Sequence, residues 1–449
     1  MPRSRRARSV ESAERPDTSP TQILAGRAWV DGQLRSVDVA LDSRGRILEV
    51  ARSLSGGPRH DVGDRVLIPA ATDLHVHLRE PGGDGESIPT GTIEAALGGI
   101  TLVGEMPNNE PPITSADRLA DKAALVRRRA AVDVLLYATP LTPEAVPALA
   151  GSAGALKVYT SPTTGIDRAL GPSEVEALLA AASRFDVPVT VHAESAARFV
   201  LPRPVRNAAD WSAARPPAAE AEAIGWTARA PDTMRLHVAH LTLPEAIPAL
   251  RAAGRSFEAT PQHLLLSQTA GADPRAKVNP PLRDRARRDA LWNAFARGDV
   301  PIVASDHAPH PRDAKTGDFG QAPSGMPGLE TMLPLLLARV RAGALPLDVL
   351  VRAACDRPAR WFGQPLGRIA PGHRANLLVV DFRARRTVAA NRLHAPCGWS
   401  AFEGWEAIWP VEHWRDGVRV VEDGEYVGRP DGEVVVPEFS PVARAERGA

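Results

Sequence analysis

Two histidines stand one residue apart at the end of an apolar run, in the stretch DLHVHLREPG (73–82), and an arginine follows two residues later. In a β-strand, residues at alternate positions point to the same side. His75, His77 and Arg79 would therefore face one pocket. Two imidazoles on one strand face can bind the same metal ion, and a catalytic zinc site keeps a further position open for water.

Other ionisable residues occur within or just after later apolar runs, namely Lys157, His192, His240 and Asp306. A single histidine in such a run is more often a hydrogen-bonded core residue than a metal ligand. Four histidines, one lysine and one aspartate at successive strand ends are better explained by convergence on one site. Because imidazoles and carboxylates are good zinc ligands, the set predicts a metal centre.

Lys157 is unusual in this set, because an ammonium group cannot bind a cation and is costly to bury beside one. Two interpretations stay open. The amine could be uncharged or paired with a carboxylate. Alternatively, CO₂ adds to the amine, and the resulting carbamate offers two oxygens that bridge two metal ions. We favour the carbamate, because six ligand positions exceed the needs of one tetrahedral ion.

Eight apolar runs, each followed by an Ala/Leu-rich helical stretch, are spaced along the middle of the chain. Uninterrupted apolar runs are typical of strands buried on both faces of a parallel sheet. Eight such units predict an α/β fold, a (β/α)₈ TIM-type barrel, in which functional groups converge on the C-terminal ends of the strands. The runs are 66–76, 99–106, 131–139, 154–160, 187–194, 235–242, 256–264 and 300–309.

Short alternating segments with hairpin-type turns, such as Asp31-Gly32, flank this region at both ends of the chain. Because chain termini often lie close together, we expect the two flanks to form one small β-rich domain. The predicted division is a disordered tail (1–20), the β-rich domain (21–67 and 362–430), the barrel (68–361) and a second disordered tail (431–449).

The bulk composition excludes several classes of protein. The chain has 449 residues and a formal net charge of +1, so no bulk electrostatic field favours nucleic acid or an anionic membrane as partner. It has two cysteines, Cys355 and Cys397, which argues against a disulfide-rich secreted scaffold. No run is long enough for a transmembrane helix, and the basic N-terminus lacks the apolar stretch of a secretory signal. We therefore expect a cytoplasmic protein.

The motifs resemble those of the amidohydrolase superfamily and, more closely, dihydroorotase. The similar stretches run in the family's order from about residue 22 to 428, and they include HLREPG, MPN, VHAE, HVAHLT, KVNPPLR, DHAPH and GRIAPGHRANLLVVD. The HxH pair alone would indicate only the superfamily, whereas HLREPG together with MPN and DHAPH is specific.

The resemblance implies two zinc ions per chain, held by His75, His77, His192, His240 and Asp306 and bridged by carbamylated Lys157. It also implies substrate contacts from Arg79, Asn108 and His310, with Asn279 and Gly325 in loops that cover the substrate ring through backbone groups. The implied reaction is the reversible cyclisation of N-carbamoyl-L-aspartate to L-dihydroorotate in de novo pyrimidine biosynthesis. A metal-bridging hydroxide would be the nucleophile and Asp306 the general base and acid.

The sequence departs from the family pattern near the second predicted strand. Glu105 stands where a small residue is usual, and Asn109 follows MPN where threonine is common. We expect both residues near the pocket, where they would bear on substrate preference. None of the departures removes a proposed metal ligand or a substrate contact.

Two other functions stay open. A hydantoinase or allantoinase would share the fold and the metal ligands, but its substrate would lack the carboxylate that Arg79 is expected to bind. A non-catalytic dihydroorotase-like subunit that supports aspartate transcarbamoylase would be free to lose its ligands, whereas all six positions are filled here. An active enzyme that forms a homo-oligomer or binds aspartate transcarbamoylase is compatible with the same motifs.

Overall fold

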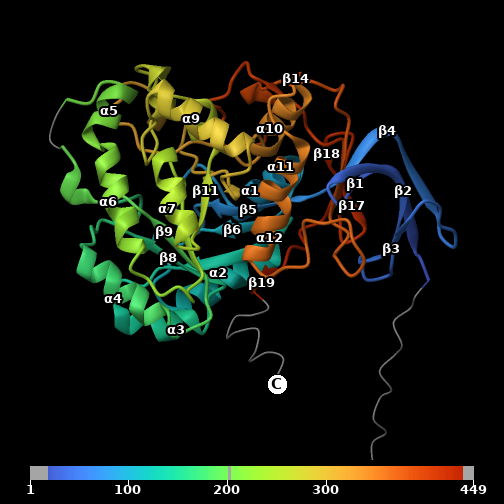
Figure 1. Ribbon diagram of the computed structural model, residues 1–449, viewed down its shortest axis with the longest axis horizontal. Helices are drawn as coiled ribbons and strands as arrows, with labels where there is room; N and C mark the ends of the chain where they lie inside the picture. Colours follow the sequence, from blue (N-terminus) through green and yellow to red (C-terminus); the bar gives the residue numbers. More distant parts are fainter. Residues whose placement is uncertain (1–18, 201–203, 438–449) are drawn as a thin grey trace, which may run out of the picture.

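The computed structural model describes residues 19–200 and 204–437, and a parallel barrel lies at its centre (Figure 1). Its strands follow one another around the barrel in sequence order: β5 (Ala71–Val76), β6 (Ile100–Glu105), β7 (Asp133–Ala138), β8 (Ala155–Tyr159), β9 (Val189–His192), β10 (Leu236–Val238), β11 (Ser256–Ala259) and β12 (Ile302–Val303). The circle is completed just beyond β12, where the amide of His77 donates to the carbonyl of His307 at 2.7 Å. The predicted eight-stranded barrel is confirmed.

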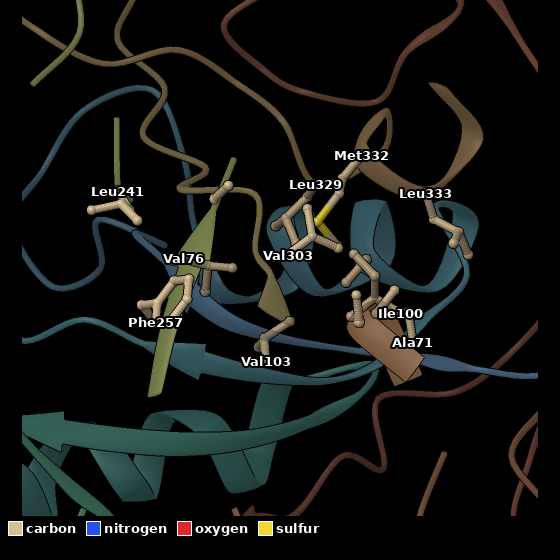
Figure 2. Close-up of a cluster of buried hydrophobic side chains, with 14 of the residues drawn as sticks. Ala71, Val76, Ile100, Val103, Leu241, Phe257, Val303, Leu329, Met332 and Leu333 are labelled. Atoms are coloured by element: carbon tan, nitrogen blue, oxygen red, sulfur yellow. The ribbon is translucent and has the colours of Figure 1, made fainter. Parts of the chain in front are cut away.

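Helices surround this barrel (Figure 1). They are α1 (Ile88–Leu97), α2 (Ala116–Arg129), α3 (Val146–Ala150), α4 (Pro172–Ala182), α5 (Ala208–Ala214), α6 (Pro217–Thr227), α7 (Ile247–Ala252), α8 (Pro261–Leu265), α9 (Arg285–Ala296), α10 (Met332–Arg341), α11 (Leu347–Val351) and α12 (Arg357–Trp361). Figure 2 shows part of the core, where strand residues such as Val103 and Phe257 share one buried cluster with Met332 and Leu333 of α10. Because most barrel strands are buried along their whole length, their sequences read as uninterrupted apolar runs.

Segments from both ends of the chain form a second, eight-stranded sheet beside the barrel (Figure 1). Strand β4 joins them, because it pairs in parallel with β1 and antiparallel with β13. The tight turn between β1 and β2 has positive φ angles at Asp31 (49°) and Gly32 (78°), as the hairpin motif predicts. In spatial order the strands are β18 (Glu425–Tyr426), β17 (Val418–Glu422), β16 (Glu412–Arg415), β13 (Leu377–Val380), β4 (Arg59–Pro69), β1 (Gln22–Val30), β2 (Gln33–Leu41) and β3 (Ile47–Ala51). A separate two-stranded sheet consists of β14 (Arg386–Thr387) and β15 (Glu406–Ala407).

The prediction of a disordered tail over 431–449 is wrong for its first part. Residues Val434–Val435 form β19, which pairs in parallel with Val134 and Leu135 at the start of β7. The neighbouring strand β8 pairs only with the later residues Tyr137 and Ala138, so the start of β7 has a free edge that β19 fills. Residues 438–449 and most of the predicted N-terminal tail (1–18) lie outside the described residues.

In the described part of the chain, each helix is too short or too polar to cross a bilayer.

Candidate metal centre

A cavity of about 300 Å³ opens at the C-terminal ends of the barrel strands. Its walls bring together ten of the eleven residues that the sequence predicted for the site: His75, His77, Arg79, Asn108, Lys157, His192, His240, Asn279, Asp306 and Gly325. The eleventh, His310, lies directly behind the wall, with its ring 3.4 Å from Arg79 and 2.9 Å from the Ser324 carbonyl.

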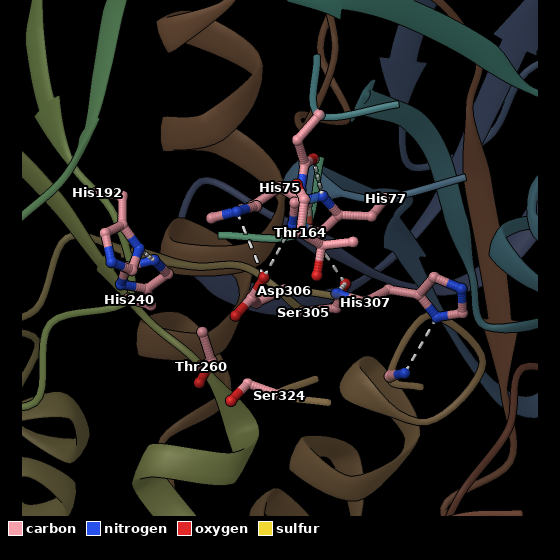
Figure 3. A network of polar contacts seen from close by, with 12 residues as sticks. His75, His77, Thr164, His192, His240, Thr260, Ser305, Asp306, His307 and Ser324 are labelled. Carbon is pink, nitrogen blue, oxygen red and sulfur yellow. Dashed lines mark hydrogen bonds and ion pairs between the residues drawn. The ribbon is translucent and has the colours of Figure 1, made fainter. Parts of the chain in front are cut away.

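One group of potential metal ligands consists of His75, His77 and Asp306 (Figure 3). The Nε2 atoms of both histidines lie 3.3 Å from the same carboxylate oxygen, Oδ1 of Asp306. Asp306 reaches this point from just beyond β12, with a left-handed backbone (φ 47°). Three converging ligand atoms leave room for a fourth, exchangeable ligand, as a catalytic zinc site requires.

Hydrogen bonds at the opposite ring nitrogens fix both imidazoles of this group. Nδ1 of His75 lies 2.7 Å from the Glu258 carboxylate, and Nδ1 of His77 lies 2.6 Å from the amide oxygen of Asn108. Each Nδ1 therefore carries the proton, and each Nε2 presents its lone pair to the cavity. Such outer partners orient metal-binding histidines and raise their basicity.

A second group consists of His192 and His240, whose facing nitrogens, Nδ1 and Nε2, are 2.9 Å apart (Figure 3). The other nitrogen of His192 lies 3.1 Å from Glu194. Although burial alone would raise it, the nearby Arg215 and His192 lower the pKa of Glu194 to about 2. Glu194 is therefore ionised at neutral pH and accepts the N–H of His192 at Nε2. Nδ1 of His192, which then carries no proton, faces His240.

Burial lowers the pKa of all four histidines, and the positive charge of Lys157, which lies close to both groups, lowers each of them further. Its side chain is fully buried, and its amine makes no hydrogen bond within residues 19–200 and 204–437. Burial lowers the pKa of this amine to about 8, which increases the neutral fraction at neutral pH. The amine lies 5.4 Å from the centroid of the Tyr159 ring, and that contact leaves its hydrogen-bonding capacity unused, which is rare for a buried lysine.

Arg79 enters the same cavity two residues after His77. Its side chain is 5% exposed, and its Nε donates to the carbonyl of Pro309 at 3.3 Å. Its Nη1 has no hydrogen-bond partner in the described regions. The neighbouring His310 donates from Nε2 to the Ser324 carbonyl, and burial together with Arg79 lowers the pKa of His310 to about 3. This ring is therefore neutral and leaves the cation of Arg79 unpaired.

A family model described as the amidohydrolase family matches residues 66–406, which is most of the chain. The chain belongs to the amidohydrolase family. The dihydroorotase of Halobacterium salinarum is 38% identical over 432 residues, covering 92% of this chain and 99% of that protein. The dihydroorotase of Thermoplasma acidophilum is 32% identical over 421 residues, covering 93% and 98%. The resemblance seen in the motifs is confirmed.

Among solved structures, this amidohydrolase is similar to the L-hydantoinase of Arthrobacter aurescens. The TM-score is 0.84 at 26% sequence identity, and the match covers 93% of this chain and 100% of the hydantoinase chain. A D-hydantoinase from Bacillus sp. AR9 gives a TM-score of 0.83 at 25% identity, with 92% and 98% covered. The barrel and its β-rich domain are thus shared with enzymes whose names indicate cyclic substrates of a different kind.

Two predicted substrate contacts of the amidohydrolase lie in loops over the cavity. The side-chain oxygen of Asn279 accepts from the indole of Trp211 at 3.2 Å. Gly325 has φ 137°, and a Cβ there would lie 2.4 Å from the carbonyl of Ala308, so only glycine fits. Its amide donates to the carbonyl of Lys277 at 2.9 Å, which leaves its own carbonyl as the group free for a substrate. Their contact with substrate stays a prediction.

Several residues of the site were missed at the sequence level. Glu258 links Nδ1 of His75 to Nε2 of His237, at 2.7 and 3.0 Å. A glutamate inside an apolar strand run was the signal that could have identified it. Tyr159, Trp211, Arg215 and Lys277 also line the cavity. Trp211 and Arg215 come from the long segment after β9, where no periodic pattern indicated which side chains turn inward.

His307 follows Asp306 in the chain but does not line the cavity. Its Nδ1 accepts from the backbone amides of Gly328 and Leu329 at 3.1 and 3.2 Å. Nε2 must then carry the proton, and it lies 3.2 Å from Glu86. With both nitrogens engaged in this way, the nearby carboxylates and His307 do not form a second metal site.

The expectation that Glu105 and Asn109 bear on substrate preference through the pocket needs correction, because neither lines the cavity. Both side chains turn away from it, toward α2. Lys122 of that helix lies 2.5 Å from Glu105 and 2.7 Å from Asn109. The buried ammonium group of Lys122 attracts the side-chain oxygens of Glu105 and Asn109. These two departures from the family pattern therefore lie behind Arg79 and do not line the cavity.

Proposed function

We propose that this amidohydrolase is a zinc-dependent dihydroorotase, which closes N-carbamoyl-L-aspartate to L-dihydroorotate and opens the ring again. The observation that carries the proposal is Arg79. It places a buried, unpaired guanidinium in the same cavity as His75, His77 and Asp306. A buried cation with free donors requires an anionic partner. Dihydroorotate supplies a carboxylate, whereas the rings of hydantoin and allantoin carry none.

The donor set suits two zinc ions. His75, His77 and Asp306 would hold one ion, His192 and His240 the other, and a carbamate on Lys157 would connect them. The unpartnered amine of Lys157 supports this assignment, since a neutral amine is the form that reacts with CO₂. When bound, the ions would lower the pKa of a water molecule and polarise the amide carbonyl of the substrate.

The protein's own groups orient the ring and move the proton. Asn108 uses its oxygen for His77 and one N–H for the carbonyl of Thr164, at 2.6 and 3.1 Å. One N–H is left, and it would join Arg79 at the substrate carboxylate. His310 would contact that carboxylate only by turning its N–H away from the Ser324 carbonyl. Asp306 would accept the proton of the attacking water and deliver it to the ring nitrogen as the amide C–N bond breaks.

The test is an assay of purified protein, loaded with zinc in bicarbonate buffer, on dihydroorotate, hydantoin and allantoin. A kcat/KM highest for dihydroorotate is expected. Faster opening of hydantoin or allantoin would contradict the proposal and favour the function of the structural neighbours. No turnover of any ring, with well under one zinc per chain, would favour a non-catalytic subunit.

The same proposal implies a cytoplasmic enzyme of de novo pyrimidine biosynthesis, as a homo-oligomer or in association with aspartate transcarbamoylase. Sedimentation of the purified protein, alone and mixed with that partner, tests the two assemblies. A monomer that fails to bind the transcarbamoylase would contradict both.

A further inference from the structure

The backbone at Arg79 has a conformation that its own sequence does not favour. Its φ is 59°, in the left-handed region, and the amide of Glu80 donates to the carbonyl of Leu78 at 2.7 Å. A three-residue turn with positive φ at its centre is rare and strained for a residue with a side chain. Such a conformation persists only where the surroundings hold it. The residues that hold this turn therefore set the position of the guanidinium.

Two buried side chains bind the backbone of the residues on either side of Arg79. A carboxylate oxygen of Glu105, the last residue of β6, accepts from the amide of Leu78 at 2.7 Å. On the other side, the side-chain amide of Asn109 donates to the carbonyl of Glu80 at 3.1 Å. Each bond fixes one end of the turn.

Lys122 joins these two side chains. It lies on the face of α2 that packs on the barrel, where Leu119, Ala123 and Val126 are also buried. Its ammonium group contacts the second oxygen of Glu105 at 2.5 Å and the side-chain oxygen of Asn109 at 2.7 Å. Glu105, Asn109 and Lys122 are each no more than 3% exposed, so water cannot replace these contacts.

We propose that Glu105, Asn109 and Lys122 form a positioning triad that holds the Arg79 turn and so determines specificity for a carboxylate-bearing ring. The proposal rests on the proposed function, in that Arg79 is the residue that binds the carboxylate. Stabilisation alone is a weaker explanation, because burying two charges costs about as much as their attraction returns. The directed bonds to the Leu78 amide and the Glu80 carbonyl are what apolar side chains could not provide.

The test is a double-mutant cycle on the zinc-loaded full-length enzyme. Glu105→Leu and Lys122→Met together replace the ion pair by apolar groups of similar size, a change that folded proteins often tolerate. Asn109→Ala is the milder variant if that pair fails to fold. The Glu105→Leu/Lys122→Met pair and Asn109→Ala are each made in the natural protein and in the Arg79→Met variant. For every protein, KM and kcat for dihydroorotate, the zinc content and the melting temperature are measured.

The expected result is a KM about tenfold higher in the natural background, with kcat within about twofold, and a KM change below about twofold in the Arg79→Met background. Equal effects in both backgrounds, an unchanged KM, or a fall in kcat alone would overturn the triad. The matched control is Asp133→Asn. This substitution weakens a buried ion pair with Arg374, whose two atoms are 2.6 Å apart. Asp133 is the first residue of β7, so it lies at the end of the barrel strands opposite the cavity, and KM should not change.

The binding of orotate, a planar ring with the same carboxylate, separates this proposal from the proposed function. It is measured by calorimetry and needs no turnover. One outcome is that the natural protein does not open dihydroorotate, while the triad substitutions weaken its binding of orotate. That outcome would contradict the proposed function and support the triad. An enzyme that opens dihydroorotate with the same KM after those substitutions would retain the function and overturn the triad.

Discussion

Replacing Arg79 by methionine should separate substrate binding from metal chemistry. Methionine keeps an unbranched apolar stem of similar reach but removes the fork of donors that a carboxylate accepts. The candidate metal ligands need not move, because the ring of His77 is fixed by the bond from its Nδ1 to Asn108. The substitution therefore tests the feature that distinguishes a dihydroorotase from the other cyclic amidases.

The size of the effect follows from burial. Arg79 is 5% exposed, so a carboxylate bound there loses most of its water and depends on the guanidinium for compensation. Removing one partner of such a buried charge pair costs about 2–5 kcal/mol. At about 1.4 kcal/mol per factor of ten, the KM for dihydroorotate should rise roughly 30-fold to 4,000-fold. The value of kcat should change only a few-fold, since Asp306 and the histidines stay in place.

The assay is steady-state ring opening of dihydroorotate, followed by the loss of ultraviolet absorbance, with zinc content measured for each preparation. Arg251→Met serves as the control, because Arg251 has a side chain 59% exposed and pairs with Asp299 at the surface. A KM for Arg79→Met within about threefold of the natural enzyme would refute the carboxylate assignment. A large fall in kcat with lost zinc would show instead that Arg79 supports the metal centre.

Three further perturbations test the centre itself. Lys157→Ala should lower kcat by more than the roughly 10- to 100-fold typical of outer-shell partners, and short carboxylic acids should partly restore it; no rescue would argue against the carbamate. Asp306→Asn should lower kcat about 10²- to 10⁴-fold with little change in KM, as removal of a general base does. Chelation should abolish activity and lower the melting temperature, with recovery on adding zinc and bicarbonate; full activity in metal-free protein would exclude the proposed centre.

The loop over the cavity offers a test of stability. Gly325→Ala would place a Cβ 2.4 Å from a carbonyl oxygen at φ 137°. The substitution should lower the free energy of unfolding by about 1–3 kcal/mol, as measured by denaturant titration. Gly343→Ala is the matched control. Gly343 also has a positive φ, but no atom lies within 4 Å of the added Cβ, so this variant measures the cost of the backbone conformation alone. Equal losses in both variants would show that crowding against Ala308 has no effect.

The barrel could be predicted because its strands are buried on both faces, which removes the polar alternation of an exposed sheet. The run AVDVLLYAT is an example, with every residue of β7 buried. The sequence could not predict that β19 pairs with the free edge of β7. Val434–Val435 carries no signal beyond two β-branched residues in a polar segment, and its pairing depends on where β8 begins.

The candidate metal ligands could be proposed from residue type, but strand parity explains only part of their geometry. His75 lies within β5 and His77 directly follows it, so alternation brings them to one side. Asp306 and His240 lie beyond the last residues of β12 and β10, and each reaches the cavity through a left-handed backbone, with φ 47° and 37°. Outer partners such as Glu258 come from strands far away in sequence. Their role depends on distances that only the closed barrel defines.

Glu105 and Asn109 show how a departure from a family motif can mislead when it is considered alone. Each replaces a usual residue beside the pocket, which suggested a changed substrate. In the folded chain both bind Lys122, a residue 13 positions beyond Asn109 that the motif comparison did not include. A buried lysine on α2 requires an acidic partner, and a buried glutamate at the end of β6 requires a cation. The three residues are therefore interdependent, and the hydrogen bonds of Glu105 and Asn109 to the Arg79 turn favour the proposed carboxylate binding over its loss.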